Sequence, residues 1–400
     1  MAEMIELREE IEKVILVGVS VEDTDDTEKS LDELEELAKT AGAVTVGRVI
    51  QNREMIHPGT YVGKGKIDEI KELLWETEAT GIICDDELTP VQLGNLQDAL
   101  DAKVMDRTLI ILDIFAARAS TNEGKIQVEL AQLKYRQSRL TGLGKSLSRG
   151  GIGTRGPGEK KLEMDRRLIK GRIAQLNREL KDVKRHREVT REQRGRTRIP
   201  VVAIVGYTNA GKSTLLNKLT GAAVLSEDKL FATLDPTTRG LKLPSKQEVL
   251  FTDTVGFIRK LPHHLIEAFK STLEEAKYAD IILHVVDTSN PQMDEQMYIV
   301  YETLRNLGVE DKTVITAFNK QDREGAETIL RDFKADYTVR ISAKTGFGLE
   351  ELLETIEKVL RECKIEIERT YDYSEAGKIQ FIRKYGELLS EEYREEGIYV

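Results

Sequence analysis

Short apolar runs alternate with helical patterns in two separate parts of the chain. In the first part, residues 14–19, 43–46 and 81–84 are strand-like, and residues 31–38 have helical spacing between the first two runs. Strands that alternate with helices are typical of α/β folds with parallel sheets. We therefore predict an N-terminal α/β unit over residues 1–118.

A second α/β series begins near residue 199. The strand-like run 199–205 is followed by a helical pattern over residues 214–219. Further apolar runs occur at 249–251, 314–318 and 339–341, and polar motifs follow each of them closely. Because ligands of α/β sheets bind at the carboxyl ends of strands, these motifs are candidates for one binding site.

Two stretches between these units have the apolar spacing of long helices that pack side by side. The first, in which Gln137 fills a missing seam position, runs through Ile126, Leu130, Leu133 and Leu140. The second runs through Ile169, Ile173, Leu176, Leu180 and Val183. Residues 141–158 join them and contain seven glycines, no acidic residue, and the basic residues Lys145, Arg149 and Arg155. The pattern predicts an antiparallel helical hairpin over residues 119–198 with a flexible cationic tip.

Residues 206–213 form a complete phosphate-loop motif, G-x-x-x-x-G-K-S, between a strand-like run and a helical pattern. This setting allows backbone N–H groups and a helix N-terminus to face a polyphosphate. We expect Lys212 to reach the β- and γ-phosphates and the Ser213 hydroxyl to bind Mg²⁺. The nucleotide-binding residues predicted here are Gly206, Tyr207, Thr208, Asn209, Ala210, Gly211, Lys212, Ser213 and Thr214.

Three shorter motifs indicate that the base is guanine. The Asp322 carboxylate accepts two hydrogen bonds from guanine, whereas adenine has no such donor pair. We expect Asp253 to hold Mg²⁺ through water and the Gly256 amide to meet the γ-phosphate. The motifs are Asp253, Thr254, Val255 and Gly256, then Asn319, Lys320, Gln321 and Asp322, then Ser342, Ala343 and Lys344, the last on a loop that closes over the base. Their order predicts a GTPase domain over residues 199–362.

The position after Asp-x-x-Gly, where many GTPases carry a water-orienting glutamine, holds Phe257. A phenyl ring cannot orient water, so intrinsic hydrolysis is expected to be slow and to depend on an outside partner. From these motifs we expect Lys212 and Gly256 to contribute to catalysis. Two interpretations of Asn209 stay open: it helps to bind K⁺ beside the phosphates, or it only braces the loop.

The charge distribution sets the hairpin apart. The formal net charge of the chain is −10, but residues 134–198 carry 21 Lys and Arg against 7 Asp and Glu. This imbalance favours a nucleic-acid contact over a solvated helical face. The two cysteines, Cys84 and Cys363, match no metal spacing and suit a reducing compartment. No apolar run reaches the roughly 18 residues of a membrane span, so we expect a cytoplasmic protein.

Other polar segments leave alternatives. Residues 59–66 are rich in glycine and lysine but lack phosphate-loop spacing, so a structural turn is favoured over a second nucleotide site. Asp85, Asp86 and Glu87 follow a strand, where the alternatives are a divalent-ion site and a solvated acidic group. The tail over residues 363–400 is expected to be a small C-terminal domain.

Four segments together closely resemble the HflX family of GTPases, and the resemblance covers essentially the whole chain. They are residues 60–66, 150–159, 206–213 and 231–235. The resemblance implies that Thr233 binds Mg²⁺ and takes part in catalysis, and that an apolar residue at position 257 is usual. It also implies that the nucleotide is contacted by Phe231, Ala232, Thr233, Leu234 and Asp235.

The resemblance further implies a cytoplasmic GTPase that associates with the large (50S) ribosomal subunit, in the splitting of stalled ribosomes or in subunit biogenesis. The glycine-rich tip is expected to reach ribosomal RNA through Lys145, Arg149 and Arg155. The alternatives are a 50S assembly GTPase, and a regulatory switch with a protein partner whose hairpin is a dimerising coiled coil. The predicted fold class is α/β, with a P-loop GTPase domain preceded by a smaller α/β domain and a long helical hairpin, and followed by a short C-terminal domain.

Overall fold

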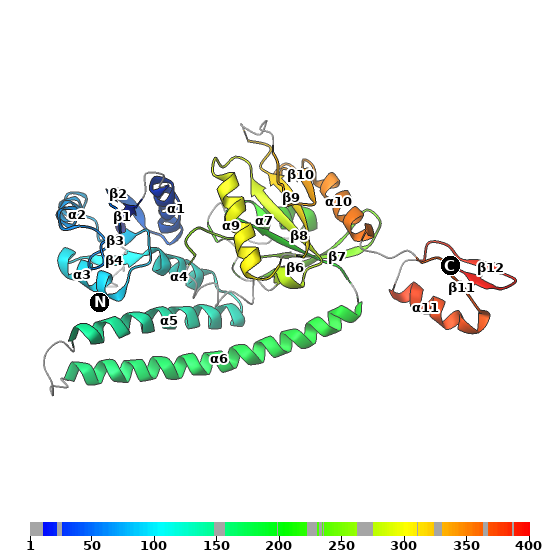
Figure 1. Ribbon diagram of the computed structural model, residues 1–400, viewed down its shortest axis with the longest axis horizontal. Helices are drawn as coiled ribbons and strands as arrows, with labels where there is room; N and C mark the ends of the chain where they lie inside the picture. The colour runs from blue at the N-terminus through cyan, green and yellow to red at the C-terminus, as the bar shows by residue number, and fades with distance from the viewer. Residues whose placement is uncertain are drawn as a thin grey trace, which may run out of the picture.

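The computed structural model arranges the chain as two α/β units that lie along a helical hairpin, with a small C-terminal unit beyond them (Figure 1). The residues that it describes are 11–21, 26–147, 157–197, 199–221, 230–231, 234, 236–261, 275–309, 311–323, 330–362, 367–385 and 388–400.

The N-terminal unit is a parallel sheet of order β2-β1-β3-β4 with helices packed on it. Its elements are β1 (Lys13–Ser20), α1 (Thr27–Thr40), β2 (Val44–Asn52), α2 (Lys64–Thr77), β3 (Gly81–Cys84), α3 (Pro90–Leu100), β4 (Lys103–Asp106) and α4 (Arg107–Arg118). The three expected strands and the helix over residues 31–38 are confirmed, whereas β4, α2, α3 and α4 were not predicted. Because β1 lies between β2 and β3, the order of strands reverses there, which is where open α/β sheets bind ligands.

The predicted antiparallel hairpin consists of α5 (Asn122–Leu147) and α6 (Pro157–Thr197), which run below both α/β units in Figure 1. Its seam is apolar as expected and includes Ile126, Leu130, Leu133, Ile173, Leu176 and Leu180. The expected loop over residues 141–158 was too long, because residues 141–147 and 157–158 are helical. Each glycine costs a helix only about 1 kcal/mol relative to alanine, which a long packed helix tolerates.

The P-loop unit is built on a six-stranded sheet of order β10-β9-β8-β5-β7-β6, in which only β6 is antiparallel to its neighbour. Its elements are β5 (Val201–Gly206), α7 (Lys212–Thr220), β6 (Thr237–Lys242), β7 (Glu248–Asp253), β8 (Ile281–Asp287), α9 (Met293–Asn306), β9 (Thr313–Asn319), β10 (Tyr337–Arg340) and α10 (Leu349–Glu362). β6 begins at Thr237, one residue after Pro236. Thr238 of β6 is hydrogen-bonded to Thr252 of β7 at 3.0 Å between the two hydroxyl oxygens.

The C-terminal unit is a small antiparallel sheet of order β11-β13-β12 with one helix beside it. Its elements are β11 (Thr370–Tyr371), the 3₁₀ turn η1 (Tyr373–Glu375), α11 (Ala376–Tyr385), β12 (Glu392–Arg394) and β13 (Gly397–Tyr399). Its core is formed by Tyr371, Ile379 and Ile398. In the described part of the chain, every helix is too short or too polar to cross a bilayer.

One apolar core extends from the N-terminal unit into the P-loop unit. Phe115 of α4 meets Phe231 edge to face, with ring centroids 4.7 Å apart. Val255, Phe257 and Ile258, which follow β7, belong to the same buried cluster. The two α/β units therefore share a hydrophobic interface that includes residues next to the predicted γ-phosphate site.

Candidate functional site

The phosphate loop joins β5 to α7 at the carboxyl edge of the six-stranded sheet, as its motif requires. Gly206 has a φ of +152°, and a Cβ added to it would lie 2.3 Å from the carbonyl oxygen of Val285. Gly211 has a φ of +96°, and a Cβ added there would lie 2.3 Å from Nδ2 of Asn319. Both positions require glycine, because the loop passes within contact distance of two neighbouring strand ends.

Lys212, the first residue of α7, is buried beneath this loop. Its ammonium donates to the carbonyl oxygens of Gly206 at 3.1 Å and Tyr207 at 2.7 Å. Burial lowers the pKa of Lys212 to about 8, while the carboxylate of Asp253 acts in the opposite direction. The ammonium therefore lies at the phosphate loop, where the sequence predicts that it contacts phosphate.

Ser213 and Asp253 form an oxygen pair that fits a Mg²⁺ site. The Ser213 hydroxyl donates to Oδ2 of Asp253 at 2.7 Å, which joins α7 to the end of β7. A hydroxyl and a carboxylate are hard ligands, and Mg²⁺ at nucleotide sites takes few protein oxygens because phosphates and water complete its shell. Thr233, the other predicted Mg²⁺ ligand, lies outside the described residues, as do Ala232 and Asp235.

Asn319 ties the guanine motifs to the phosphate loop. Its Nδ2 donates to the carbonyl oxygen of Ala210 at 2.8 Å, and its Oδ1 accepts from the N–H of Ala343 at 2.9 Å. The Ser342 hydroxyl donates to Oδ1 of Asp322 at 2.7 Å, and this hydrogen bond lowers the pKa of Asp322. The carboxylate predicted to read guanine is thus held in its ionised form beside the second loop.

A segment that sequence reasoning missed, residues 287–289 at the end of β8, braces the guanine motif. Oδ2 of Asp287 accepts from the Lys320 ammonium at 2.6 Å. Thr288 donates both its N–H and its hydroxyl to the carbonyl oxygen of Asn319, at 3.1 and 2.7 Å. The available signal was a polar Asp-Thr-Ser directly after a buried apolar run, which is the context of the other motifs.

Phe257, which stands where many GTPases have a glutamine, is only 2 % exposed, in the core that the two α/β units share. Its N–H donates to the carbonyl oxygen of Gly206 at 3.1 Å, and its carbonyl oxygen accepts from the N–H of Thr208 at 2.8 Å. Position 257 therefore packs the interface and aligns two backbone segments, which explains the apolar residue there.

Four predicted nucleotide-binding residues direct their side chains into protein. The Thr254 hydroxyl donates to the carbonyl oxygen of Ile204 at 2.7 Å. Phe231, Leu234 and Val255 belong to the shared apolar core. Any contact of these residues with a nucleotide is therefore made by the backbone.

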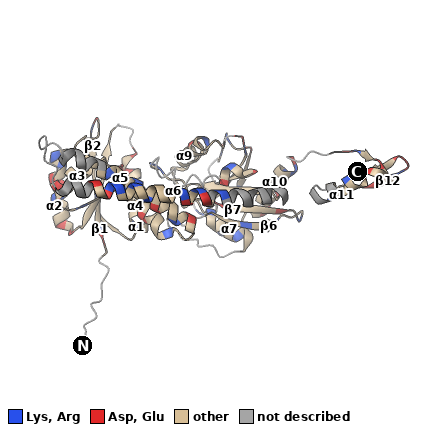
Figure 2. Ribbon diagram, turned by 90° about the horizontal axis from the view of Figure 1, so that it is seen from below, with Lys and Arg blue, Asp and Glu red and all other residues tan. Residues whose placement is uncertain are grey.

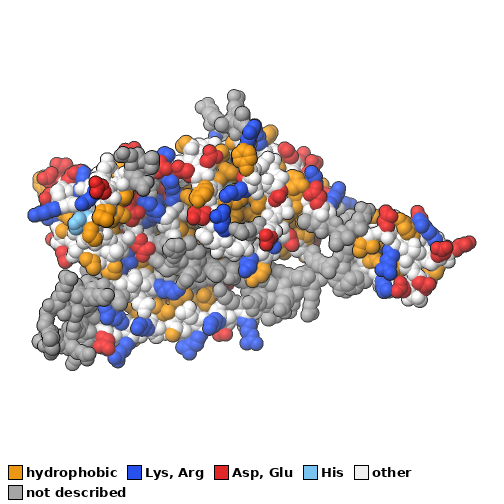
Figure 3. Space-filling model, in the orientation of Figure 1, with side chains coloured by type: hydrophobic (Ala, Val, Ile, Leu, Met, Phe, Trp, Pro, Cys, Tyr) orange, Lys and Arg blue, Asp and Glu red, His pale blue; other side chains and the backbone are white. Residues whose placement is uncertain are grey.

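The hairpin carries the expected basic surface. Lysine and arginine positions recur along α6 in Figure 2, and basic side chains project from the lower edge of the molecule in Figure 3. Arg172 of α6 pairs with Glu129 of α5 at 2.7 Å. Of the three predicted RNA contacts, Lys145 lies in α5, whereas Arg149 and Arg155 lie outside the described residues.

The acidic segment at the end of β3 does not form the metal site that was one alternative. Asp85 and Asp86 both pair with the Lys260 ammonium, the latter at 2.7 Å. Within the described ranges, no three acidic, histidine or cysteine side chains gather as metal ligands.

Three family profiles match the chain: "GTP-binding GTPase N-terminal" over residues 28–116, "GTP-binding GTPase Middle Region" over 118–194 and "50S ribosome-binding GTPase" over 201–320. GTPase HflX from Lacrimispora saccharolytica is 71% identical to the chain, over 100% of the chain and 95% of the relative. GTPase HflX from Caldanaerobacter subterraneus subsp. tengcongensis is 50% identical over 99% of the chain and 92% of the relative.

Among solved structures, the crystal structure of the SsGBP and GDP complex aligns with a TM-score of 0.50 and 26% identity. The alignment covers 88% of this chain and 100% of that one. These similarities agree with the P-loop, the guanine motifs and the Ser213–Asp253 pair described above. The chain is a GTPase and belongs to the HflX family.

Proposed function

We propose that this GTPase binds the large ribosomal subunit in its GTP-bound form, grips ribosomal RNA with the hairpin, and thereby splits stalled ribosomes in the cytoplasm. The proposal rests chiefly on the basic surface of α6, an arm that connects directly to the GTPase unit (Figure 2). The match of residues 201–320 to the 50S ribosome-binding GTPase family supports the same partner.

The central test is co-sedimentation with purified 50S subunits in the presence of GDP or of a non-hydrolysable GTP analogue. We expect binding to be tighter with the analogue. The logarithm of the affinity should fall linearly with the logarithm of salt concentration, because lysine and arginine displace counterions from phosphates. Equal affinity in both nucleotides would contradict GTP gating.

Deletion of residues 148–156, which connect α5 to α6, tests the RNA contact. We expect the deletion to weaken 50S binding and to leave GDP affinity unchanged, since the phosphate and guanine sites lie in the other unit. A regulatory switch with a dimerising coiled coil predicts the opposite: dimerisation would persist, and 50S binding would not depend on the tip.

Two further measurements define the reaction. If Phe257 leaves intrinsic hydrolysis slow, 50S subunits should raise the single-turnover rate, and an unchanged rate would contradict partner activation. Hydrolysis in KCl and in NaCl at equal ionic strength tests the proposed K⁺ site at Asn209, for which equal rates would favour the bracing role. Preference for immature over mature 50S subunits would instead support an assembly GTPase.

A further inference from the structure

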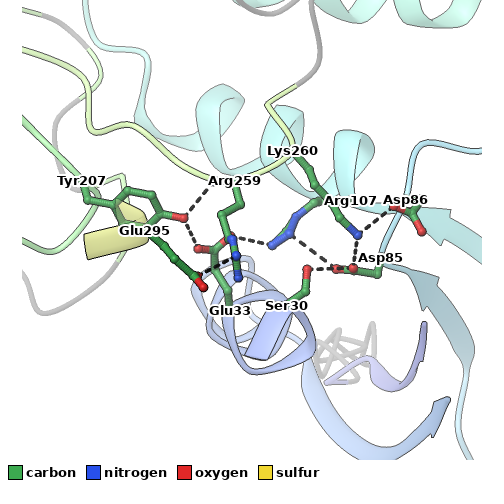
Figure 4. Close-up of polar contacts among 9 residues, drawn as sticks. All are labelled: Ser30, Glu33, Asp85, Asp86, Arg107, Tyr207, Arg259, Lys260 and Glu295. Carbon is green, nitrogen blue, oxygen red and sulfur yellow. Dashed lines mark hydrogen bonds and ion pairs between the residues drawn. The ribbon is translucent and has the colours of Figure 1, made fainter. Parts of the chain in front are cut away.

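The phosphate loop makes a direct polar contact with the N-terminal unit. The Tyr207 hydroxyl donates to a carboxylate oxygen of Glu33 in α1 (Figure 4). The same hydroxyl accepts from the backbone N–H of Arg259 at 2.8 Å. One oxygen atom therefore joins the phosphate loop, the segment after Asp-x-x-Gly and the N-terminal unit.

Glu33 is itself held by a buried arginine. Arg107, the first residue of α4, is 1 % exposed and donates to the other carboxylate oxygen of Glu33 at 2.6 Å. Arg107 also contacts Asp85 at 3.4 Å, and Asp85 accepts from the Ser30 hydroxyl at 2.7 Å. Buried charges of this kind persist only when they are paired, so Glu33 has little freedom to move alone.

The Lys260 ammonium makes a second contact between the units (Figure 4). It pairs with Asp85 and Asp86, which directly follow β3. This is the carboxyl edge beside the β1–β3 boundary, where open α/β sheets bind their ligands. The N-terminal unit therefore uses its expected binding edge to hold a side chain of the GTPase unit.

These contacts hold Gly256 close to the phosphate loop. A Cβ added to Gly256 would lie 3.0 Å from the Lys212 ammonium and 2.9 Å from the Cα of Thr208. Gly256 therefore lies against both the phosphate loop and the ammonium that is predicted to reach the γ-phosphate. A γ-phosphate that hydrogen-bonds to both the ammonium and the Gly256 amide has to enter between these two groups. The Gly256 segment is tied to the N-terminal unit through Arg259 and Lys260, which follow it within four residues.

The residue before Arg107 holds the hairpin. Asp106 is fully buried, and its carboxylate accepts from the Tyr135 hydroxyl at 2.8 Å and from the Arg139 guanidinium, both on α5. It also caps α4 by accepting from the N–H of Leu109 at 2.9 Å. Of these two adjacent residues, Arg107 contacts Glu33, which binds the phosphate-loop residue Tyr207, and Asp106 contacts the hairpin helix α5.

We propose that Glu33, Arg107 and Asp106 are positioning residues by which the N-terminal unit couples the phosphate site to the hairpin. Glu33, held by Arg107, keeps Tyr207 and Arg259 in the arrangement that disfavours a γ-phosphate. Asp106, through Tyr135 and Arg139, holds α5 against the N-terminus of α4. The hairpin half of this coupling rests on the proposed function, whereas the nucleotide half does not.

The nucleotide half is tested with Tyr207→Phe in the full chain. The measurement is the ratio of the Kd for GDP to the Kd for a non-hydrolysable GTP analogue, by fluorescence titration. We expect the ratio to rise about five-fold, the effect of one net hydrogen bond. Tyr301→Phe is the matched control, because its hydroxyl also donates to a carboxylate, Asp332 at 2.6 Å, but that carboxylate belongs to the GTPase unit itself. The control ratio should stay within about two-fold of wild type.

Glu33→Gln and Lys260→Ala should raise the ratio in the same direction. Lys260→Ala serves as the test if Tyr207→Phe fails to bind GDP, since the Lys260 side chain is partly exposed. An unchanged or lowered ratio in the variants that bind GDP, or an equal rise in Tyr301→Phe, would overturn the proposal.

The hairpin half is tested with Asp106→Asn, which keeps the helix cap and removes the charge that faces Arg139. We expect wild-type nucleotide affinities but a smaller difference in 50S affinity between GTP analogue and GDP. If the wild type shows this difference and Asp106→Asn retains all of it, the coupling through Asp106 is wrong. If wild-type protein binds 50S subunits equally well with the GTP analogue and with GDP, the proposed function fails. The Tyr207→Phe measurement still decides whether the N-terminal unit acts on the phosphate site.

Discussion

Asp287 at the end of β8 and Lys320 of the guanine motif form an ion pair of 2.6 Å, and both side chains are largely buried. Lys320 has a φ of +66°, an uncommon conformation for a residue with a side chain. It directly follows Asn319 and precedes by two residues Asp322, the carboxylate predicted to bind guanine. The pair therefore fixes the backbone turn on which the guanine motif depends.

Asp287→Asn is expected to weaken GDP binding about ten-fold, because a charged hydrogen bond of roughly 1.5–3 kcal/mol is reduced to a neutral one. Isothermal titration calorimetry with GDP measures the change. Glu362→Gln is the matched control, since its pair with Lys358 is 3.9 Å long and exposed. GDP affinity within about two-fold of wild type in Asp287→Asn would show that the turn holds without the pair.

Nucleotide affinity is expected to fall as the pH rises above about 8, where free Lys212 loses its proton. A bound polyphosphate places negative charge beside the ammonium and raises the pKa of Lys212. Binding above pH 8 therefore takes up a proton, and the Kd for GDP should rise by up to about ten-fold per pH unit until the bound-state pKa is reached. Calorimetry in buffers of different ionisation enthalpy measures this uptake. Lys212→Arg, which stays protonated, should abolish it; unchanged uptake would assign the proton to another group.

Phe257→Gln is expected to destabilise the protein by about 3 kcal/mol without accelerating intrinsic hydrolysis. The substitution removes a buried ring and leaves an amide in an apolar core. Denaturant unfolding and single-turnover hydrolysis at saturating GTP measure the two effects. Phe333→Gln, at a ring that is 90% exposed, should leave stability unchanged. Faster hydrolysis by Phe257→Gln without ribosomes would show that the site lacks only a water-orienting amide.

Leu176→Ala is expected to destabilise the hairpin by about 2–4 kcal/mol, because this side chain is fully buried in its seam. Leu168→Ala on the same helix is the control, at a side chain that is 67% exposed, and should cost less than about 0.5 kcal/mol. Helical circular dichroism during urea unfolding follows both variants. Equal effects at the two positions would contradict the packing of the seam.

The strand ends and the seam could be predicted from the sequence because short-range physics determines them. Gly206 and Gly211 adopt positive φ where the motif places them, and each guanine motif follows an apolar run. The spacing of Leu130 and Leu176 indicated two long helices that pack together. Loop limits were less accurate, since glycines at 142 and 144 are tolerated within α5.

Contacts between distant segments could not be predicted in the same way. Tyr207 and Glu33 are 174 residues apart, and nothing in the local sequence of either indicates the other. The phosphate-loop motif leaves the residue type at position 207 unspecified, so Tyr207 was predicted only as part of the nucleotide-binding loop, with no role for its hydroxyl. Phe257 was interpreted only as the absence of a glutamine, because its apolar neighbours come from another unit.

The two arms of the hairpin continue into different α/β units. α5 follows α4 after residues 119–121, while α6 leads into β5 at Val201. A rotation of one unit against the other is therefore also a shear of α5 along α6. Interlocked side chains resist gradual sliding, so such a shear is confined to small shifts of about 1–2 Å or to a jump of one helical turn. α6 is roughly 60 Å long. A small rotation of its C-terminal end, next to the GTPase unit, therefore becomes a large displacement at its N-terminal end near Pro157.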